Sequence, residues 1–457
     1  MKERDDMPVD ARSRREFLAL AGTSAAGFLL ARPHDAIGQM VGGSGPFNDY
    51  RALVCLFLFG GNDSFNMLVP RSMAEYNAYA ASRQNLAVAQ ADLLPIDSLN
   101  PDGALYGVHP SMPGLHALFA QESAAFVANV GPLIVPTTKA QYQARSVALP
   151  PQLFSHNDQQ AQWHSLRGRT LGDTGWAGRM ADLIRLNVAG QQLATNVSLT
   201  GNSLFQSGDD TVAYTMGAAG PLPFLGFPGL GGEQRRAFER IVNATYHSIY
   251  ARGFAEVQRR AVESADRVTA AIAQAPPLTT QFPAGSLGQQ FQTVARLISV
   301  RDRLAMRRQV FLVSAGGFDS HDDQLVNQPA LLASVSACLA AFYAATVELG
   351  VAHAVTTFTQ SDFGRTLTSN GDGTDHAWGG VQVVIGQSVR GRRIFGRYPS
   401  LALNGPEDVG AGRLIPGVSA DQYAATLARW FGIADTDLAR VAPHIGNFAE
   451  RDLGFLA

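Results

Sequence analysis

The sequence predicts an α/β fold built on a mainly parallel sheet, and three observations support this class. Segments 52–59, 309–314 and 352–359 are short, apolar and rich in β-branched or aromatic residues, as expected for strands covered on both faces. Segments 124–130 and 381–386 have the same character. Helical spacing of apolar residues recurs between strands, at 291–303 and 331–349. Strands that alternate with helices are typical of a doubly wound sheet.

The N-terminus has the pattern of an export signal. Arg14 and Arg15 form a pair that is followed by a weakly apolar run, 17–31. This run is shorter than the ~20 strongly apolar residues of a membrane span. We therefore expect a twin-arginine signal peptide over 1–36 and a flexible Gly-rich segment over 37–50.

The signal predicts a cellular location and a first partner. A twin-arginine signal implies that the twin-arginine translocase exports the chain already folded, so the protein is expected to be periplasmic or extracellular. No stable membrane span is expected in the mature chain.

Charge and cysteine content exclude several classes of protein. The chain has 36 basic and 38 acidic residues, a net charge of −2, which does not favour nucleic acid as a partner. Its two cysteines, Cys55 and Cys338, lie in an apolar strand and an apolar helix. Both are expected to be small core residues, not a disulfide pair.

Residues 51–457 are predicted to form one α/β domain that carries an insertion at about 189–285. A Gly- and Pro-rich stretch, 217–232, precedes a long segment with helical periodicity, 233–274. This region is expected to be a largely helical cap that packs on the sheet.

Acidic residues and histidines follow three of the predicted strands. Open α/β sheets bind ligands beyond the carboxyl ends of their strands, so these residues are expected at one edge. A single Asp in such a place is usually a turn former or a helix cap. Several buried carboxylates without countercharge are costly, and a divalent cation is the usual neutraliser. The strand-end residues are Asp63, Asp319, His321, Asp362, Asp375 and His376.

A further polar cluster, Ser155-His156-Asn157-Asp158, stands at a predicted helix start. Ser155 is either the N-cap of this helix or a hydroxyl nucleophile presented at its N-terminus. His156 and Asp158 are candidates for hydrogen bonds to a substrate.

Four motifs together resemble the domain-of-unknown-function family DUF1501. They are Gly-Gly-Asn-Asp after the first strand, Phe-Ser-His-Asn-Asp-Gln, Gly-Gly-Phe-Asp-Ser-His, and Asp-Phe-Gly-Arg-Thr with Gly-Thr-Asp-His-Ala-Trp-Gly-Gly. The resemblance covers 52 to about 446, nearly the whole mature chain. That family is grouped with the alkaline phosphatase-like superfamily. The resemblance implies a three-layer α/β/α sandwich, one or two divalent metals (Zn, Mg, Mn or Ca), and reactions at phosphate or sulfate esters.

The resemblance also implies roles for individual residues. Phe363 stands where the superfamily usually has a ligand, His or Asn, and no Cys/Ser-x-Pro-x-Arg motif is present, which argues against a formylglycine sulfatase. Asp375 would orient His376 or bind the metal itself. The other residues carried over as metal ligands are Asp63, Asp319, His321, Asp362 and His376.

The sequence therefore predicts an exported metal-dependent hydrolase acting on a phosphate or sulfate ester of a small molecule or polysaccharide. Arg365 is expected to clamp the anionic ester, or else to pair with Asp362. The alternative is a non-catalytic secreted binding or assembly protein in which the same residues hold a structural metal.

Overall fold

The computed structural model describes residues 45–100, 103–168, 172–221 and 232–457. The predicted signal peptide and residues 37–44 of the predicted flexible segment lie outside this part of the chain. The chain divides into two compact units. The main unit is Ser44–Pro221 with Val268–Ala457, and the described part of the smaller unit is 232–267.

The main unit is built on a nine-stranded sheet with the order β11-β5-β10-β9-β1-β8-β6-β7, in which β12 also pairs with β5. Its pairs are parallel except those of β10, which runs antiparallel to β5 and β9. The strands are β1 Arg51–Leu58, β5 Ala124–Gly131, β6 Asn196–Ser198, β7 Tyr214–Thr215, β8 Arg308–Ala315, β9 Val355–Ser361, β10 Gly380–Ile385, β11 Ile394–Phe395 and β12 Val418–Ser419. The five predicted strands are confirmed, although residues 352–354 form a 3₁₀ turn before β9.

A small antiparallel sheet of β2 (Leu68–Pro70), β4 (Tyr106–Val108) and β3 (Leu94–Ile96) also belongs to the main unit. The helices of this unit are α2 Ser64–Met67, α3 Met73–Arg83, α4 Pro113–Ala120, α5 Lys139–Ala144, α6 His156–Ser165, α7 Trp176–Ile184, α10 Ser286–Ser299, α11 Gln324–Glu348, α12 Ala420–Phe431 and α13 Leu438–Val441. Short 3₁₀ turns lie at η1 Gln84–Leu86, η2 Leu204–Gln206, η3 Ala352–Ala354, η4 Asp435–Asp437 and η5 Ile445–Asn447.

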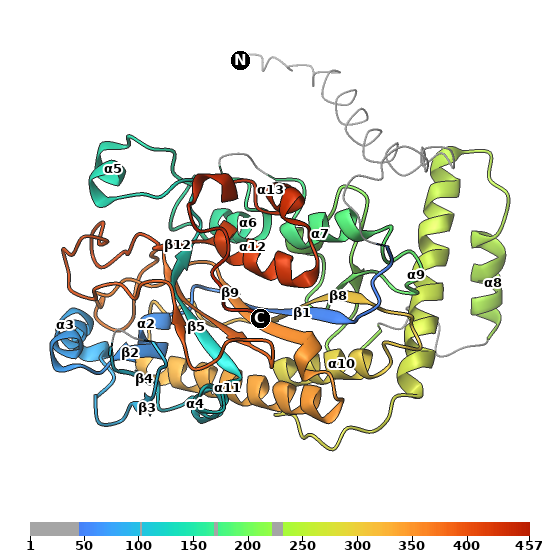
Figure 1. Cartoon of the computed structure of the whole chain (residues 1–457). Helices are drawn as coiled ribbons and strands as arrows, with labels where there is room; N and C mark the ends of the chain where they lie inside the picture. Colours follow the sequence, from blue (N-terminus) through green and yellow to red (C-terminus); the bar gives the residue numbers. More distant parts are fainter. Residues whose placement is uncertain (1–44, 101–102, 169–171, 222–231) are drawn as a thin grey trace, which may run out of the picture. The chain divides into compact units, whose positions relative to one another are not determined.

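Helices cover both faces of the sheet, so the predicted three-layer α/β/α arrangement is confirmed. Residues of β1 alternate between two cores because successive side chains of a strand point to opposite faces. Val54 and Leu56 pack in the core that includes α4, α10 and α11, whereas Leu53 and Phe57 pack in the core that includes α6, α7, α12 and α13. Figure 1 shows these two sets of helices on opposite sides of the strands. Cys55 and Cys338 are buried and unpaired, as predicted.

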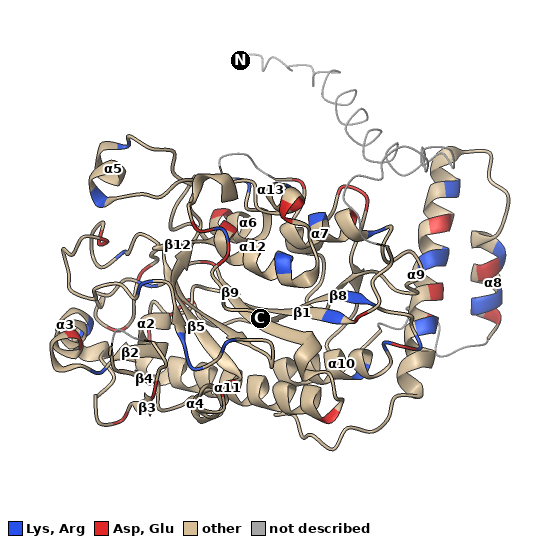
Figure 2. Ribbon diagram, in the orientation of Figure 1, with Lys and Arg blue, Asp and Glu red and all other residues tan. Residues whose placement is uncertain are grey.

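The predicted insertion, about 189–285, has two parts in the structure. Its first part contributes β6 and β7 to the main sheet. Its later part forms α8 (Glu233–Val242) and α9 (Ile249–Ala273) instead of one continuous helix over 233–274. Arg235 of α8 pairs with Asp266 of α9, and basic and acidic residues alternate along both helices (Figure 2).

Helix α11 is the one helix in the described part of the chain that is long and apolar enough to cross a membrane by length and composition. Its buried side supplies Leu332, Val335 and Leu339 to the core of the main unit. This packing accounts for its apolar character.

Candidate metal centre

The predicted site residues lie around the carboxyl edge of the sheet, where three connections meet. The segment after β1 carries Asp63, and the segment after β8 carries Asp319 and His321. Residues 362–379 connect β9 to β10. Because β10 runs antiparallel to β9, this connection leaves and re-enters the sheet at the same edge. The topology thus brings motifs that are far apart in sequence to one place.

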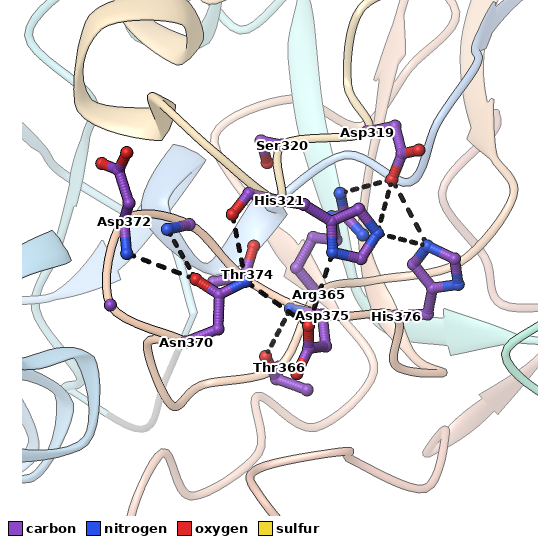
Figure 3. A network of polar contacts seen from close by, with 12 residues as sticks. Asp319, Ser320, His321, Arg365, Thr366, Asn370, Asp372, Thr374, Asp375 and His376 are labelled. Atoms are coloured by element: carbon purple, nitrogen blue, oxygen red, sulfur yellow. Dashed lines mark hydrogen bonds and ion pairs between the residues drawn. The ribbon is translucent and has the colours of Figure 1, made fainter.

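The connection 362–379 folds back on itself as a short hairpin. Arg365 forms an antiparallel bridge with His376, and the main-chain N–H of Thr366 donates to the carbonyl of Asp375 at 3.0 Å. The two motifs on either side of the Gly-rich turn are therefore the two arms of the hairpin. Figure 3 shows the rings of His321 and His376 beneath Asp319, with dashed lines from the carboxylate of Asp319 to both rings and to Arg365.

The glycine pair after β1 permits close approach of the other connections. Gly60 has a φ of 114°, and a Cβ at this position would stand 2.2 Å from the main-chain nitrogen of Asp319. Gly61 has a φ of 87°, and a Cβ there would meet the ring of Phe363 at 2.4 Å. Both positions therefore need glycine, for conformation and for space.

The carboxylate of Asp319 is the centre of a cluster of imidazoles. Its Oδ1 lies 3.1 Å from Nε2 of His321 and 3.3 Å from Nε2 of His376, and its Oδ2 lies 3.4 Å from Nε2 of His156. These side chains are partly exposed, from 23% for His376 to 47% for Asp319. The cluster is therefore within reach of solvent and of a small ligand.

The three imidazoles share one orientation. Nδ1 of each ring faces an oxygen, and Nε2 of each ring points toward Asp319. Nδ1 of His156 and Nδ1 of His376 are hydrogen-bonded to their oxygens, so in these two rings the proton belongs on Nδ1 and Nε2 has a free lone pair. Histidines that bind metals usually have this arrangement, since the acceptor behind the ring holds the tautomer and the direction of the ring. The acceptors are Oδ2 of Asp362 for His156 at 2.7 Å, the carbonyl of Phe154 for His376 at 2.7 Å, and Oδ1 of Asp375 for His321 at 3.4 Å.

The spacing of these donor atoms fits a divalent cation. Two ligand atoms that each lie ~2.0–2.1 Å from one tetrahedral Zn²⁺ are about 3.3–3.4 Å apart. The contacts of Asp319 with His156 and His376 have this length, and the ligand atoms of the three residues all lie within 4.8 Å of one another. Nε2 of His321 and Nε2 of His376 are 2.8 Å apart, which is the length of a hydrogen bond and is closer than two ligand atoms of one tetrahedral Zn²⁺.

Electrostatics favour the metal-binding forms of these side chains. Burial, together with the charges of His156, Arg365 and His321, lowers the pKa of His376, although its hydrogen bond to Phe154 opposes this. Burial alone would raise the pKa of Asp319, but Arg365 and the histidines lower it below its ordinary value. A neutral imidazole and an ionised carboxylate are the forms that ligate metals.

Arg365 is fully buried and donates from Nη2 to Oδ1 of Asp319 at 2.8 Å. The structure therefore pairs Arg365 with Asp319, and not with Asp362. In this position the guanidinium keeps the central carboxylate ionised and oriented.

The start of α6 contributes both a side chain and a carbonyl. Phe154 has a φ of 76°, which is unusual for a residue other than glycine, and its carbonyl accepts from His376. Ser155 occupies the N-cap position but makes no side-chain cap hydrogen bond, and its hydroxyl donates to Asp158 at 2.7 Å. The nucleophile role of Ser155 and the substrate contact of Asp158 stay predictions.

The structure does not bring all the predicted ligands to one point. Asp319, His321 and His376 lie together, whereas Asp362 and Asp375 lie behind imidazoles and orient them. Asp63 is buried in an ion pair with Arg83 and also accepts from Gln324.

The sequence did not predict the roles that His156 and Gln160 have in this cluster. His156 was predicted to contact a substrate, but its Nε2 belongs to the group of candidate ligand atoms. The sequence segment marked it as functional without indicating this role. Gln160, one turn later in α6, donates to Asp362 at 2.9 Å; it belongs to the polar cluster seen in the sequence, but no role was predicted for it.

The fold and this cluster define an α/β protein with a candidate divalent-metal centre at the carboxyl edge of its sheet. The chain matches the family described as "Protein of unknown function (DUF1501)" over residues 50–443, and it belongs to this family. The resemblance seen in the sequence motifs is thereby confirmed. No protein with a curated description matches the chain.

Several solved structures are distantly similar to the chain. The lipoteichoic acid synthase LtaP from Listeria monocytogenes has a TM-score of 0.36 at 9% identity, covering 85% of this chain and 73% of its own. The soluble domain of lipooligosaccharide phosphoethanolamine transferase A from Neisseria meningitidis has a TM-score of 0.36 at 8% identity, covering 91% and 96%. A sulfatase from Pseudoalteromonas sp. has a TM-score of 0.32 at 10% identity, covering 99% and 77%.

Proposed function

We propose that the protein is an exported metal-dependent hydrolase that acts on a phosphate or sulfate ester. The observation that carries the proposal is the shared orientation of His156, His321 and His376, whose Nε2 atoms all face Asp319. The ligand atoms of His156, Asp319 and His376 lie within 4.8 Å of one another, and with acceptors behind the two rings they suit a divalent cation such as Zn²⁺.

A bound divalent cation supplies Lewis acidity at an ester oxygen and lowers the pKa of the attacking water or hydroxyl. The chain's own groups have separate tasks. The imidazoles hold the cation, Asp319 balances its charge, and Arg365 keeps Asp319 ionised from the buried side. An ester anion has access from the solvent side, where Asp319 and His321 are most exposed.

The proposed location is the periplasm or the extracellular space, after export by the twin-arginine translocase. Arg14 and Arg15 support this route. A small-molecule or polysaccharide ester is the proposed substrate, because the half-exposed cluster does not restrict the size of the leaving group.

The proposal is tested on the folded, purified chain. Metal content is measured first, and hydrolysis of 4-nitrophenyl phosphate, bis(4-nitrophenyl) phosphate and 4-nitrophenyl sulfate is then followed with Zn²⁺, Mg²⁺, Mn²⁺ or Ca²⁺. We expect turnover that a chelator abolishes and one of these ions restores. His376→Ala should lose both metal and turnover, whereas His353→Ala, an exposed histidine of η3, should lose neither.

The outcomes separate the two candidate functions. A wild-type chain that binds no metal and hydrolyses none of these esters would refute the hydrolase. A chain that holds one metal tightly and has no turnover would favour the secreted binding or assembly protein with a structural metal. The ring of Phe363 gives this second reading some support, because it packs against His156 and His376 with centroids 4.9 and 4.6 Å apart, where the superfamily has a ligand.

A further inference from the structure

Asp63, the predicted ligand after β1, already has a countercharge from within the chain. Its Oδ2 forms an ion pair with Nη2 of Arg83, and both side chains have no exposed surface. Gln324 donates to the same oxygen, and Gln328 donates to the main-chain carbonyl of Asp63 at 2.8 Å. Oδ2 of Asp63 is therefore neutralised from within the chain, whereas its Oδ1 is buried without a hydrogen-bond partner.

Every nitrogen of the Arg83 guanidinium has an acceptor. Nε donates to Oδ1 of Asn66 at 3.1 Å, and Nη1 donates to the carbonyl of Thr366 at 2.8 Å, while Nη2 serves Asp63. Arg83 therefore ties the end of β1 to the hairpin arm that carries Arg365, one residue before Thr366. A buried guanidinium with a full set of partners is stable in its charged form.

Asp362, the other buried carboxylate that a second cation would need, is also engaged through one of its two oxygens. Oδ2 of Asp362 accepts from Nδ1 of His156 and from Gln160. The residue that follows Asp362 is Phe363, whose ring has no donor atom and fills the space beside Gly61. Among the described residues, the buried polar atoms without a hydrogen-bond partner include Oδ1 of Asp63, Oδ1 of Asp362, and Nε and Nη1 of Arg365.

The balance of charge disfavours a second ion. The side chains of Asp63, Asp362, Arg83 and Arg365 have no exposed surface, and these two carboxylates and two guanidinium groups balance each other. Burial lowers the pKa of Arg365, but the charges of Asp319 and Asp63 oppose this effect. The half-exposed carboxylates of Asp319 and Asp375 balance one divalent cation, and a second would lie near two guanidinium groups that are buried away from water.

We infer that the centre takes a single divalent cation and that Arg83 supplies at Asp63 the positive charge of a second one. The inference rests on the proposed function, since it concerns the same cluster. It makes Arg83 a positioning residue, which holds the hairpin arm of Arg365 against the end of β1, and it removes Asp63 from the ligand set.

The test counts ions bound per chain by elemental analysis after equilibration with Zn²⁺ and gel filtration. We expect one ion in the wild type and one in Asp63→Asn, which keeps the shape of the side chain, but none in His376→Ala. Two ions in the wild type, with one lost in Asp63→Asn, would overturn this inference and leave the proposed hydrolase standing. No ion in the wild type would overturn the proposed function, and this inference with it.

Arg83 itself is tested by Arg83→Met, with Arg83→Lys as the charge-retaining control. Without the guanidinium, Oδ2 of Asp63 is released, and it becomes available as a metal ligand together with the unpartnered Oδ1 atoms of Asp63 and Asp362. We therefore expect Arg83→Met to bind a second Zn²⁺ and to gain more in melting temperature from added Zn²⁺ than the wild type does, whereas Arg83→Lys should retain one ion. A stoichiometry of one in folded Arg83→Met would overturn the role of Arg83. If this variant does not fold, the Asp63→Asn count still decides the inference.

Discussion

The acceptor behind His156 offers a quantitative test of the centre. Asp362 has no exposed side-chain surface, and its Oδ2 accepts from both Nδ1 of His156 and Nε2 of Gln160. Asp362→Asn keeps the shape of this side chain and removes its charge. Because two donors converge on one position, the amide oxygen is expected to stay there. His156 then keeps its tautomer but becomes less basic.

The expected loss follows from that geometry. Removing an acceptor behind a metal-binding histidine typically weakens metal affinity by about 10- to 100-fold, or about 1.4–2.8 kcal/mol. Since Asp362→Asn retains the hydrogen bond, we expect the lower end, about tenfold. The measurement is competition for Zn²⁺ against a chromophoric chelator at pH 7.5.

The matched control is Asp158→Asn, on the same helix. Asp158 accepts from Ser155 and contacts none of the three histidines through the described contacts. Its substitution should leave the affinity for Zn²⁺ unchanged. Equal affinity of Asp362→Asn and the wild type would refute the proposed orientation of His156, and so would a larger loss in the Asp158→Asn control.

The other predictions concern pH, the nucleophile and export. Burial raises the pKa of Asp421 to about 7, and an acid whose pKa is higher in the folded state loses stability as pH rises from about 4 to 7. In Asp421→Asn, the amide oxygen can still accept from the main-chain N–H of His444. The free energy of unfolding of this variant, measured with urea, should therefore equal that of the wild type at pH 4 and exceed it at pH 8. The same difference at both pH values would contradict this prediction. Ser155→Ala should keep turnover within about threefold if water attacks, and lose several orders of magnitude if the hydroxyl does. Arg14→Lys with Arg15→Lys should retain the folded precursor in the cytoplasm, as fractionation would reveal, and normal secretion would exclude the twin-arginine route.

Much of the sheet could be predicted because its strands are buried on both faces. Segments such as 52–59 are continuously apolar, and the structure places them at the centre of the sheet as β1 and its neighbours. The antiparallel direction of β10 could not be predicted, since its sequence is as apolar as that of a parallel strand. Strand direction depends on the connection 362–379, and its hairpin pairing is not visible as a periodic pattern.

The candidate site was predictable in composition but not in geometry. These site residues could be predicted because they follow strands, and the carboxyl edge of a sheet brings such residues together. They are His321, His376, Asp319 and Asp362. Which oxygen lies behind which imidazole and orients it depends on packing between distant elements. The partner of His376 is a main-chain carbonyl, which any residue at 154 could supply, so no residue type marks it. Arg83 lies in an ordinary helical pattern, and only the fold brings it to Asp63.

The start of α6 is where the resemblance and the structure lead to different chemistry. The resemblance implies a hydroxyl nucleophile there, and Ser155 was the candidate. In the structure the hydroxyl of Ser155 is engaged by Asp158, while the next residue, His156, directs Nε2 into the cluster. Neighbouring residues in a helix point about 100° apart around the helix axis, so Ser155 and His156 face different groups. A helix start that presents a candidate ligand, His156, beside the candidate nucleophile is consistent with attack by water.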